Sequence, residues 1–185
     1  MKTRVDMNAR EFVVRSGYPA DCQALTALYL RSRTTAMPWL VSPHDEAATR
    51  WWMEHVVLAE QRVWVAQSVD RLLGFAAVRG RWLEQLYVDP NDQGGAVGRS
   101  LLNVTKSVSP DGMLLHVFTR NFRARRFYEA ADFILTEQSD GRRNEECEPD
   151  CTYRWPATTR PTTSGIETRG MSGDLKHVTG TNRTP

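Results

Sequence analysis

The segment "LYVDPNDQGGAVGRSLLNV", residues 86–104, places Gly94, Gly95 and Gly98 between an apolar run and an amphipathic stretch. The apolar run predicts a strand, and residues 98–108 predict a helix. Backbone N–H groups at a helix N-terminus have no intrahelical acceptor and point the same way, so a glycine-rich turn there favours a phosphate group. The chemistry expected of this segment is therefore the binding of a phosphorylated molecule.

Two common phosphate-binding loops do not fit this segment. A P-loop needs Gly-Lys-Ser/Thr, and that triplet is absent from the sequence. A dinucleotide loop needs G-x-G-x-x-G and an acidic residue about twenty positions later. Here the glycine spacing differs, and the next predicted strand, "MLLHVFT", ends without a carboxylate. Neither a nucleoside triphosphate nor a dinucleotide is favoured.

The glycine segment resembles the first coenzyme A-binding motif of the GCN5-related N-acetyltransferases (GNATs), Q/R-x-x-G-x-G/A. Gln93 opens the motif and Gly98 closes it, while Ala96 stands where the family usually has glycine. Alanine still presents its N–H group to a ligand provided that its φ is negative. The departure at Ala96 therefore weakens the match without removing it.

A second segment, "NFRARRFYEAADF", resembles the family's second coenzyme A motif, N-x-x-A-x-x-F-Y-E-x-x-G-F. Asp132 replaces the usual glycine of that motif. Two motifs in the expected order are more specific than either alone, and the resemblance covers roughly residues 11–155. The residues in register are Asn121, Ala124, Phe127, Tyr128 and Phe133.

The resemblance implies that acetyl-CoA is the acyl donor and that no metal takes part. The amides of residues 94–99 would cap the pyrophosphate, and the pantetheine arm would lie in a gap between the fourth and fifth strands. Arg99 would either add a charged contact or remain a solvated surface arginine. The cofactor-binding residues so implied are Leu86, Val88, Gln93, Gly94, Gly95, Ala96, Val97, Gly98, Arg99, Asn121, Ala124 and Phe127.

The resemblance also implies direct attack by a primary amine in a ternary complex, with the Val88 N–H polarising the thioester carbonyl. Tyr128 would protonate the leaving sulfur, or else pack against the cofactor without proton transfer. Glu84 in "WLEQLYV" is the expected base. Strand alternation places it on one face with Trp82 and Leu86, where apolar neighbours favour proton uptake by a carboxylate. The alternative is that Glu84 faces solvent or pairs with an arginine.

The N-terminal helices form the acceptor pocket in the family, so Trp39 and His44 are the expected substrate-binding residues. Their alternatives are loop packing for Trp39 and a surface position for His44. His116, in the middle of "LLHVF", is expected to be a core histidine. The compact N-terminal region favours a small-molecule amine as the acceptor. A non-catalytic coenzyme A sensor is the alternative, supported by Ala96 and Asp132.

Composition limits the remaining function classes. With 185 residues, of which 41% are hydrophobic, one domain is expected over residues 1–156, followed by a disordered tail at 157–185. A net charge of +2 without a basic run argues against nucleic acid, and no segment reaches membrane-spanning length. Three cysteines favour a reducing, cytoplasmic setting. A homodimer through the sheet edge or the last strands is compatible with this picture.

The order of predicted elements is β-α-α-β-β-β-α-β-α-β-β. It predicts an α+β fold in which helices flank a mixed sheet. The resemblance to the GNATs implies in addition that the sheet is mostly antiparallel and has a V-shaped splay between the fourth and fifth strands. Ser42, followed by Pro43, is the expected cap of the second helix. The predicted strands cover residues 11–17, 62–69, 72–80, 82–88, 113–119, 133–139 and 152–155, and the helices cover 19–35, 42–58, 98–108 and 121–131.

Overall fold

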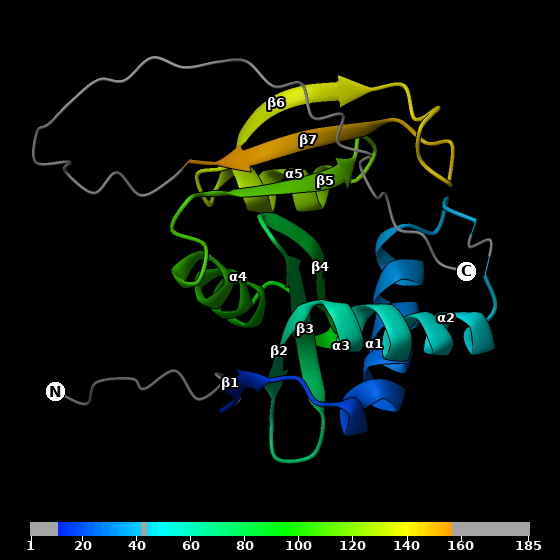
Figure 1. Ribbon diagram of the computed structural model, residues 1–185, viewed down its shortest axis with the longest axis vertical. Helices are drawn as coiled ribbons and strands as arrows, with labels where there is room; N and C mark the ends of the chain where they lie inside the picture. The colour runs from blue at the N-terminus through cyan, green and yellow to red at the C-terminus, as the bar shows by residue number, and fades with distance from the viewer. Residues whose placement is uncertain (1–10, 42–43, 157–185) are drawn as a thin grey trace, which may run out of the picture.

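The computed structural model describes residues 11–41 and 44–156. Seven strands form one sheet in the order β1-β2-β3-β4-β5-β7-β6, with helices on both faces (Figure 1). The strands are β1 (Val13–Ser16), β2 (Arg62–Gln67), β3 (Leu72–Arg79), β4 (Trp82–Val88), β5 (Met113–Phe118), β6 (Ile134–Ser139) and β7 (Asp150–Trp155). The helical segments are η1 (Pro19–Asp21), α1 (Cys22–Ala36), α2 (Glu46–Trp52), the π-helical turn η2 (Met53–Val57), α3 (Leu58–Glu60), η3 (Pro90–Asp92), α4 (Val97–Ser107) and α5 (Phe122–Glu129).

The sheet consists of two antiparallel parts joined by one parallel contact. Strands β1 to β4 pair antiparallel, as do β5, β7 and β6. Between β4 and β5 the parallel register holds at a single residue pair, Trp82 with Leu114. The two strands diverge beyond that pair, as Figure 1 shows. The predicted α+β fold and its splay are therefore confirmed.

Two apolar layers hold the sheet between the helices. Every residue of β3 from Leu72 to Val78 is buried, because α4 covers one face of this strand and α1 covers the other. Ala76 packs on the α4 side and Phe75 on the α1 side. Each fully buried Leu or Phe contributes about 1.5–3 kcal/mol. This double coverage fixes β4, the neighbour of β3, as one wall of the splay.

A β-bulge interrupts β4 at Glu84. Ala77 pairs with Gln85, but the next residue, Val78, pairs with Leu83, so Glu84 is the extra residue. The bulge shifts the alternation of β4 by one position. Trp82 and Leu86 consequently point to opposite faces of the sheet, and the prediction that they share one face with Glu84 was wrong.

Other local expectations were partly wrong. Helix α2 begins at Glu46 and is capped by Asp45, whose carboxylate accepts the Ala48 N–H at 2.8 Å, so the cap is not Ser42. Ser42, Pro43 and the expected tail 157–185 lie outside the described residues. Among the described residues, no helix combines the length and apolar character that crossing a membrane requires.

Strand β5 is covered on one face only, whereas His116 in its middle was expected to be a core histidine. Met113, Leu115 and Val117 are buried in the layer that contains α4, but the alternate residues are not. His116 is exposed rather than a core histidine. The reason is that none of the described helices covers this side of β5, and the open face of the strand borders the splay.

Candidate active site

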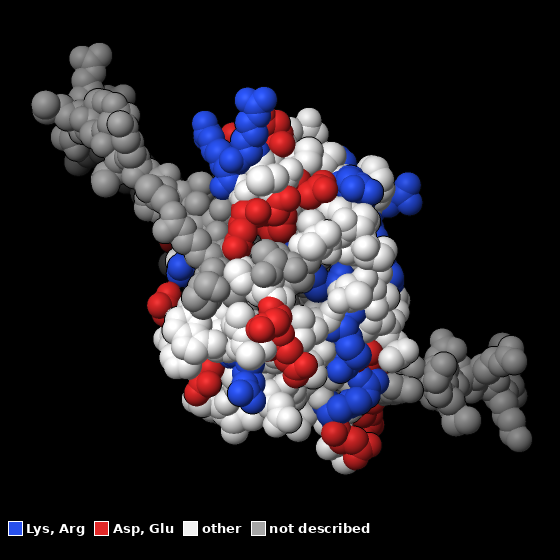
Figure 2. Space-filling model, turned by 90° about the vertical axis from the view of Figure 1, so that its right-hand side faces the viewer, with Lys and Arg blue, Asp and Glu red and all other residues white. Residues whose placement is uncertain are grey.

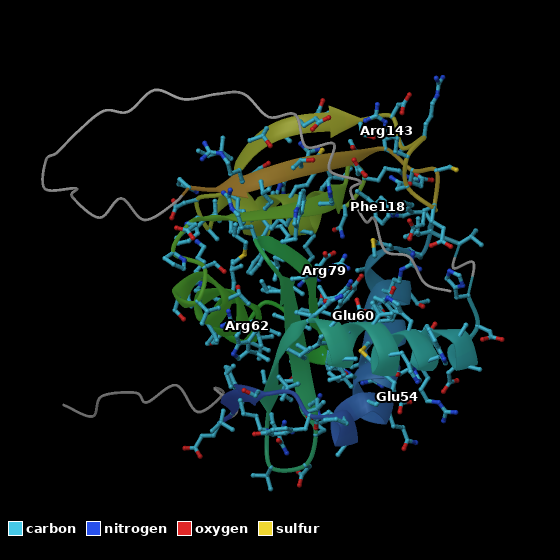
Figure 3. All side chains as sticks on the ribbon, viewed as in Figure 1. Glu54, Glu60, Arg62, Arg79, Phe118 and Arg143 are labelled. Atoms are coloured by element: carbon cyan, nitrogen blue, oxygen red, sulfur yellow. The ribbon has the colours of Figure 1, made fainter. Side chains whose placement is uncertain are left out.

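The splay contains a cavity of about 450 Å³ that extends from the glycine loop to the loop between β6 and β7. Figure 3 shows Phe118 on the β5 side of this region and Arg79 on the β3 side. Of the predicted site residues, the cavity brings together Glu84, Leu86, Val88, Gln93, Gly94, Gly95, Gly98, Arg99, Asn121, Ala124, Phe127 and Tyr128.

The glycine loop ends at a helix whose first amides have no intrahelical acceptor. Ser100 N–H donates to the Ala96 carbonyl at 2.8 Å, which is the first helical bond of α4. The amides of Val97, Gly98 and Arg99 precede it, so they remain the free donors of the helix N-terminus. Ala96 has a φ of −79°. This negative value is the condition under which alanine in place of glycine can still present its N–H group to a ligand. This end of the cavity is suited to a phosphate.

Two glycines of the loop are constrained in different ways. Gly94 has a φ of +84°, in the left-handed region that other residues rarely adopt. At Gly98, a Cβ would lie 3.5 Å from a Val88 methyl and 3.6 Å from the Phe127 ring. A methyl group fits that space, but a larger side chain would project into the cavity.

The backbone of β4 directs polar groups into the splay. Asp89 N–H donates to the Leu73 carbonyl at 2.8 Å, so by alternation the peptide groups of Leu86 and Val88 point away from β3. The Val88 carbonyl accepts hydrogen bonds from Ser32 Oγ and Gln93 Nε2, both at 3.0 Å. The Val88 N–H consequently faces the cavity, and Gln93 braces the loop against the strand.

The second motif forms the wall that faces the glycine loop. Asn121 caps α5 by accepting the Ala124 N–H at 3.1 Å. Tyr128 is buried between Phe127 and Phe133 in edge-on contacts, and burial raises the pKa of its hydroxyl well above the ordinary value. Tyr128 therefore presents a neutral phenol to the cavity.

Asp132 ends α5 with a φ of +65°. This left-handed position is where glycine is usual, and aspartate tolerates it better than most residues. The replacement noted in the sequence thus preserves the end of the helix.

Glu84 pairs with an arginine, which was the alternative left open by its sequence. Arg79 donates to Glu84 Oε1 from Nε at 3.1 Å and from Nη2 at 2.9 Å. Arg79 also lies 4.0 Å from Glu60 at the end of α3. The Glu84 side chain is only 14% exposed and borders the cavity. Its carboxylate is thus held in place by a cation at one edge of the splay.

The opposite end of the cavity is lined by Asn144, Glu146 and Asp150, none of which was a predicted site residue. Arg33 on α1 and Glu146 in the β6–β7 loop form an ion pair at 2.7 Å, with both side chains more than nine-tenths buried. Asn144 Nδ2 donates to Asp150 Oδ2 at 2.9 Å. The signal in the sequence was residues 140–150, "DGRRNEECEPD", which hold five carboxylates and two arginines. Acidic side chains gather in clusters on the face seen in Figure 2.

Two aromatic contacts border the open side of β5. His116 stacks on Trp82 with the ring centres 4.6 Å apart, and its Nδ1 lies 3.2 Å from the Thr152 hydroxyl. Phe118 contacts Trp39 edge-on, with the ring centres 5.9 Å apart. His116 and Phe118 both line the cavity, although neither was a predicted site residue.

Four predicted site residues do not line the cavity. Trp39 lies behind Phe118 with the guanidinium of Arg120 over its ring, and His44 lies 2.9 Å from Glu145. Val97 is buried in the apolar layer of α4, and Ala96 precedes that helix. Among the described residues, no group of three or more His, Cys, Asp or Glu side chains is arranged to hold a metal ion.

Comparison with known proteins agrees with this geometry. Residues 59–135 match the model of the acetyltransferase (GNAT) domain. This match, the similarity to named acetyltransferases and the fold shared with GNAT structures support a place for the chain in the GNAT superfamily of acyl-CoA-dependent acetyltransferases. The matched segment contains the glycine loop, α4, β5 and α5.

The chain is similar to two Escherichia coli proteins named peptidyl-lysine N-acetyltransferases. It is 28% identical to YjaB over 131 residues, 69% of this chain and 85% of the relative, and 24% identical to YiaC over 132 residues, 68% and 85%. The apo-YjaB solution structure superposes with a TM-score of 0.66, at 23% identity, over 80% of this chain and 99% of the other. YncA from Salmonella typhimurium, determined with its cofactor acetyl-CoA, gives 0.61 at 19% identity, over 84% and 99%.

Proposed function

We propose that this protein transfers the acetyl group of acetyl-CoA to a primary amine by direct attack within a ternary complex. The observation that carries the proposal is the single cavity, which connects free helix amides at one end with carboxylates at the other. An anionic donor and a cationic acceptor would enter from opposite ends. The splay would bring the thioester and the amine together without a covalent enzyme intermediate.

The donor would be bound largely by backbone. The amides at the start of α4 would hold the pyrophosphate, and Asn121, Ala124 and Phe127 would line the path of the pantetheine arm. The Val88 N–H, which faces the splay, would donate a hydrogen bond to the thioester oxygen as negative charge develops there. These groups are fixed before the donor arrives, so little reorganisation is needed during the reaction.

Two side chains are proposed to move protons. Glu84 would take the proton from the acceptor ammonium, directly or through water, since Arg79 holds its carboxylate at the cavity edge. Tyr128 would donate a hydrogen bond and then a proton to the leaving thiolate. Because burial raises the pKa of Tyr128, the phenol keeps its proton throughout the neutral range.

We propose the lysine side chain of a peptide as the acceptor, on the strength of the names of YjaB and YiaC. A lysine carries its amine at the end of a flexible alkyl stem that can reach into a splay. Free small-molecule amines, the acceptors expected from the sequence, are the second candidate. They are favoured by the compact region formed by α1 and α2.

Thiol release from acetyl-CoA, measured against lysine peptides, polyamines, aminoglycosides and free amino acids, tests both candidates. We expect turnover with lysine peptides. Turnover restricted to small amines would overturn the peptide acceptor. If every amine failed, thermal stabilisation by coenzyme A without turnover would favour the non-catalytic sensor. The absence of stabilisation would contradict the interpretation of the glycine loop.

Two substitutions test the proton-transfer roles. Tyr128→Phe should lower kcat by about 100- to 1000-fold while leaving the KM for acetyl-CoA unchanged. Because the pKa of Tyr128 is raised, this loss should be constant from about pH 6 to about pH 9. Glu84→Gln should lower kcat most at the acidic end of that range, where more of the amine is protonated. Unchanged turnover in either variant would remove that residue from the mechanism.

A further inference from the structure

Four carboxylates line the cavity, and three of them are neutralised by an arginine. A carboxylate that already has a close arginine partner offers little to an incoming cation. The three pairs are Glu84 with Arg79, Asp92 with Arg71 and Glu146 with Arg33, at 2.9, 2.6 and 2.7 Å.

Asp150, the first residue of β7, is the fourth carboxylate, and it differs from the other three. It is only 7% exposed, and its contact with Asn144 at 2.9 Å is to a neutral amide. Within residues 11–41 and 44–156, no Lys, Arg or His nitrogen lies within ion-pair distance of it. A buried charge is costly unless a counter-charge or strong hydrogen bonds compensate it. Asp150 is therefore a buried carboxyl group at the cavity wall whose side-chain hydrogen bond is to a neutral amide rather than to a cation.

The local structure holds this carboxylate in place. Asn144 Nδ2 also donates to the Glu148 carbonyl at 2.7 Å, and Asn144 Oδ1 accepts the Glu148 N–H at 3.1 Å. Both the nitrogen and the oxygen of the Asn144 side-chain amide are thus held by the backbone of Glu148. Asp150 pairs across the strands with Phe118, which lines the same cavity. The carboxylate and an aromatic ring are therefore presented together, an arrangement suited to an alkylammonium group.

We propose that Asp150 binds the ammonium group of the acceptor as it enters and makes the enzyme selective for cationic alkylamines. Asn144 is the positioning residue that orients the Asp150 carboxylate. This inference rests on the proposed function and specifies the acceptor class of the same site. It assigns Asp150 to binding, whereas proton removal belongs to Glu84.

The test is the kinetics of Asp150→Asn with a lysine peptide. Asparagine is isosteric, so we expect the KM for the peptide to rise by about 10- to 100-fold with the KM for acetyl-CoA unchanged. Thermal stabilisation by coenzyme A should also persist, since asparagine has the same shape as aspartate and can keep the contact with Asn144. Glu148→Gln is the matched control. The Glu148 side chain lies in the same loop, is 26% exposed and does not line the cavity, so this substitution should leave the peptide KM unchanged.

Charge selectivity supplies a second measurement. A peptide with Nε-dimethyllysine, which is cationic, should inhibit the wild-type enzyme more strongly than the same peptide with norleucine. The two peptides should inhibit the Asp150→Asn variant equally. Retained selectivity with an unchanged peptide KM would overturn the role of Asp150 and leave the proposed function intact. Loss of coenzyme A stabilisation in the variant would also overturn it, whereas absence of any wild-type turnover would overturn both proposals.

Discussion

The two ends of the cavity are built in opposite ways. At the proposed donor end, the phosphate site consists of the amides at the start of α4 in one continuous stretch, residues 93–99, of which Gln93, Gly94, Gly95, Gly98 and Arg99 line the cavity. At the proposed acceptor end, Glu146 lines the cavity and is held by the buried Arg33 of α1, 113 residues away in the chain. The donor end is therefore a product of local structure, and the acceptor end depends on tertiary packing.

This contrast implies that the two ends of the cavity respond differently to substitution. A backbone site tolerates many side-chain replacements, provided that glycine remains where a Cβ would obstruct. A site made of side chains changes whenever one of its distant contributors changes. A substitution that changes side-chain charge should therefore mainly affect the acceptor end, and one that changes side-chain size beside the backbone should mainly affect the donor end.

The largest effect is expected at the acceptor end. Glu146→Gln removes the counter-charge of Arg33 and leaves a buried guanidinium uncompensated, which should cost about 3–5 kcal/mol in the free energy of unfolding. Denaturant titration measures this cost. Glu145→Gln is the matched control, because the Glu145 side chain is 34% exposed and its pairing with His44 should contribute less than about 1 kcal/mol. Equal costs would show that burial does not distinguish the two pairs.

The second effect is expected at the donor end and depends on size rather than charge. Gly98→Leu should raise the KM for acetyl-CoA by about 100-fold, since the side chain would displace the pyrophosphate from the start of α4. Gly98→Ala should change it little, because its methyl would make ordinary contacts with Val88 and Phe127. Steady-state kinetics with varied acetyl-CoA separates the two. Equal behaviour of both variants would contradict a donor site shaped by backbone.

The smallest effect concerns Asp89, a charged residue that holds the donor loop. Burial alone would raise the pKa of its carboxylate, but hydrogen bonds from Arg31 and the Asn91 N–H, with the charge of Arg71, lower it overall. A lowered folded-state pKa contributes stability above the unfolded value of about 3.9, and this is lost as pH falls through the folded value.

Asp89→Asn should therefore destabilise the protein by about 1.5 kcal/mol near neutral pH, with the difference from wild type shrinking below about pH 4. Thermal or denaturant unfolding across that pH range measures the effect. A difference that does not change with pH would show that Asp89 acts through packing rather than through its charge.

The strands, the helices and the donor end were predictable because their signals are local. Glycine spacing and helix periodicity are properties of a few neighbouring residues, and the structure has a turn and helices at these positions. The open face of β5 was not predictable, because it depends on which face no helix covers. His116 was consequently assigned to the core.

The acceptor end was not predictable for a related reason. Arg33, Glu146 and Asp150 are ordinary charged residues in their own segments, and only the fold brings them together. Trp39 and His44 were selected for their chemical types, but both contact other protein groups beside the cavity.

The bulge at Glu84 has a consequence for insertions and deletions in this chain. Because it is the one extra residue between two regular stretches of β4, it sets the phase of the strand on either side. Deleting Glu84 would remove more than a carboxylate. It would restore strict alternation, so that Trp82 turned to the opposite face and separated from His116. A replacement that keeps the length of the strand would leave that stacking in place.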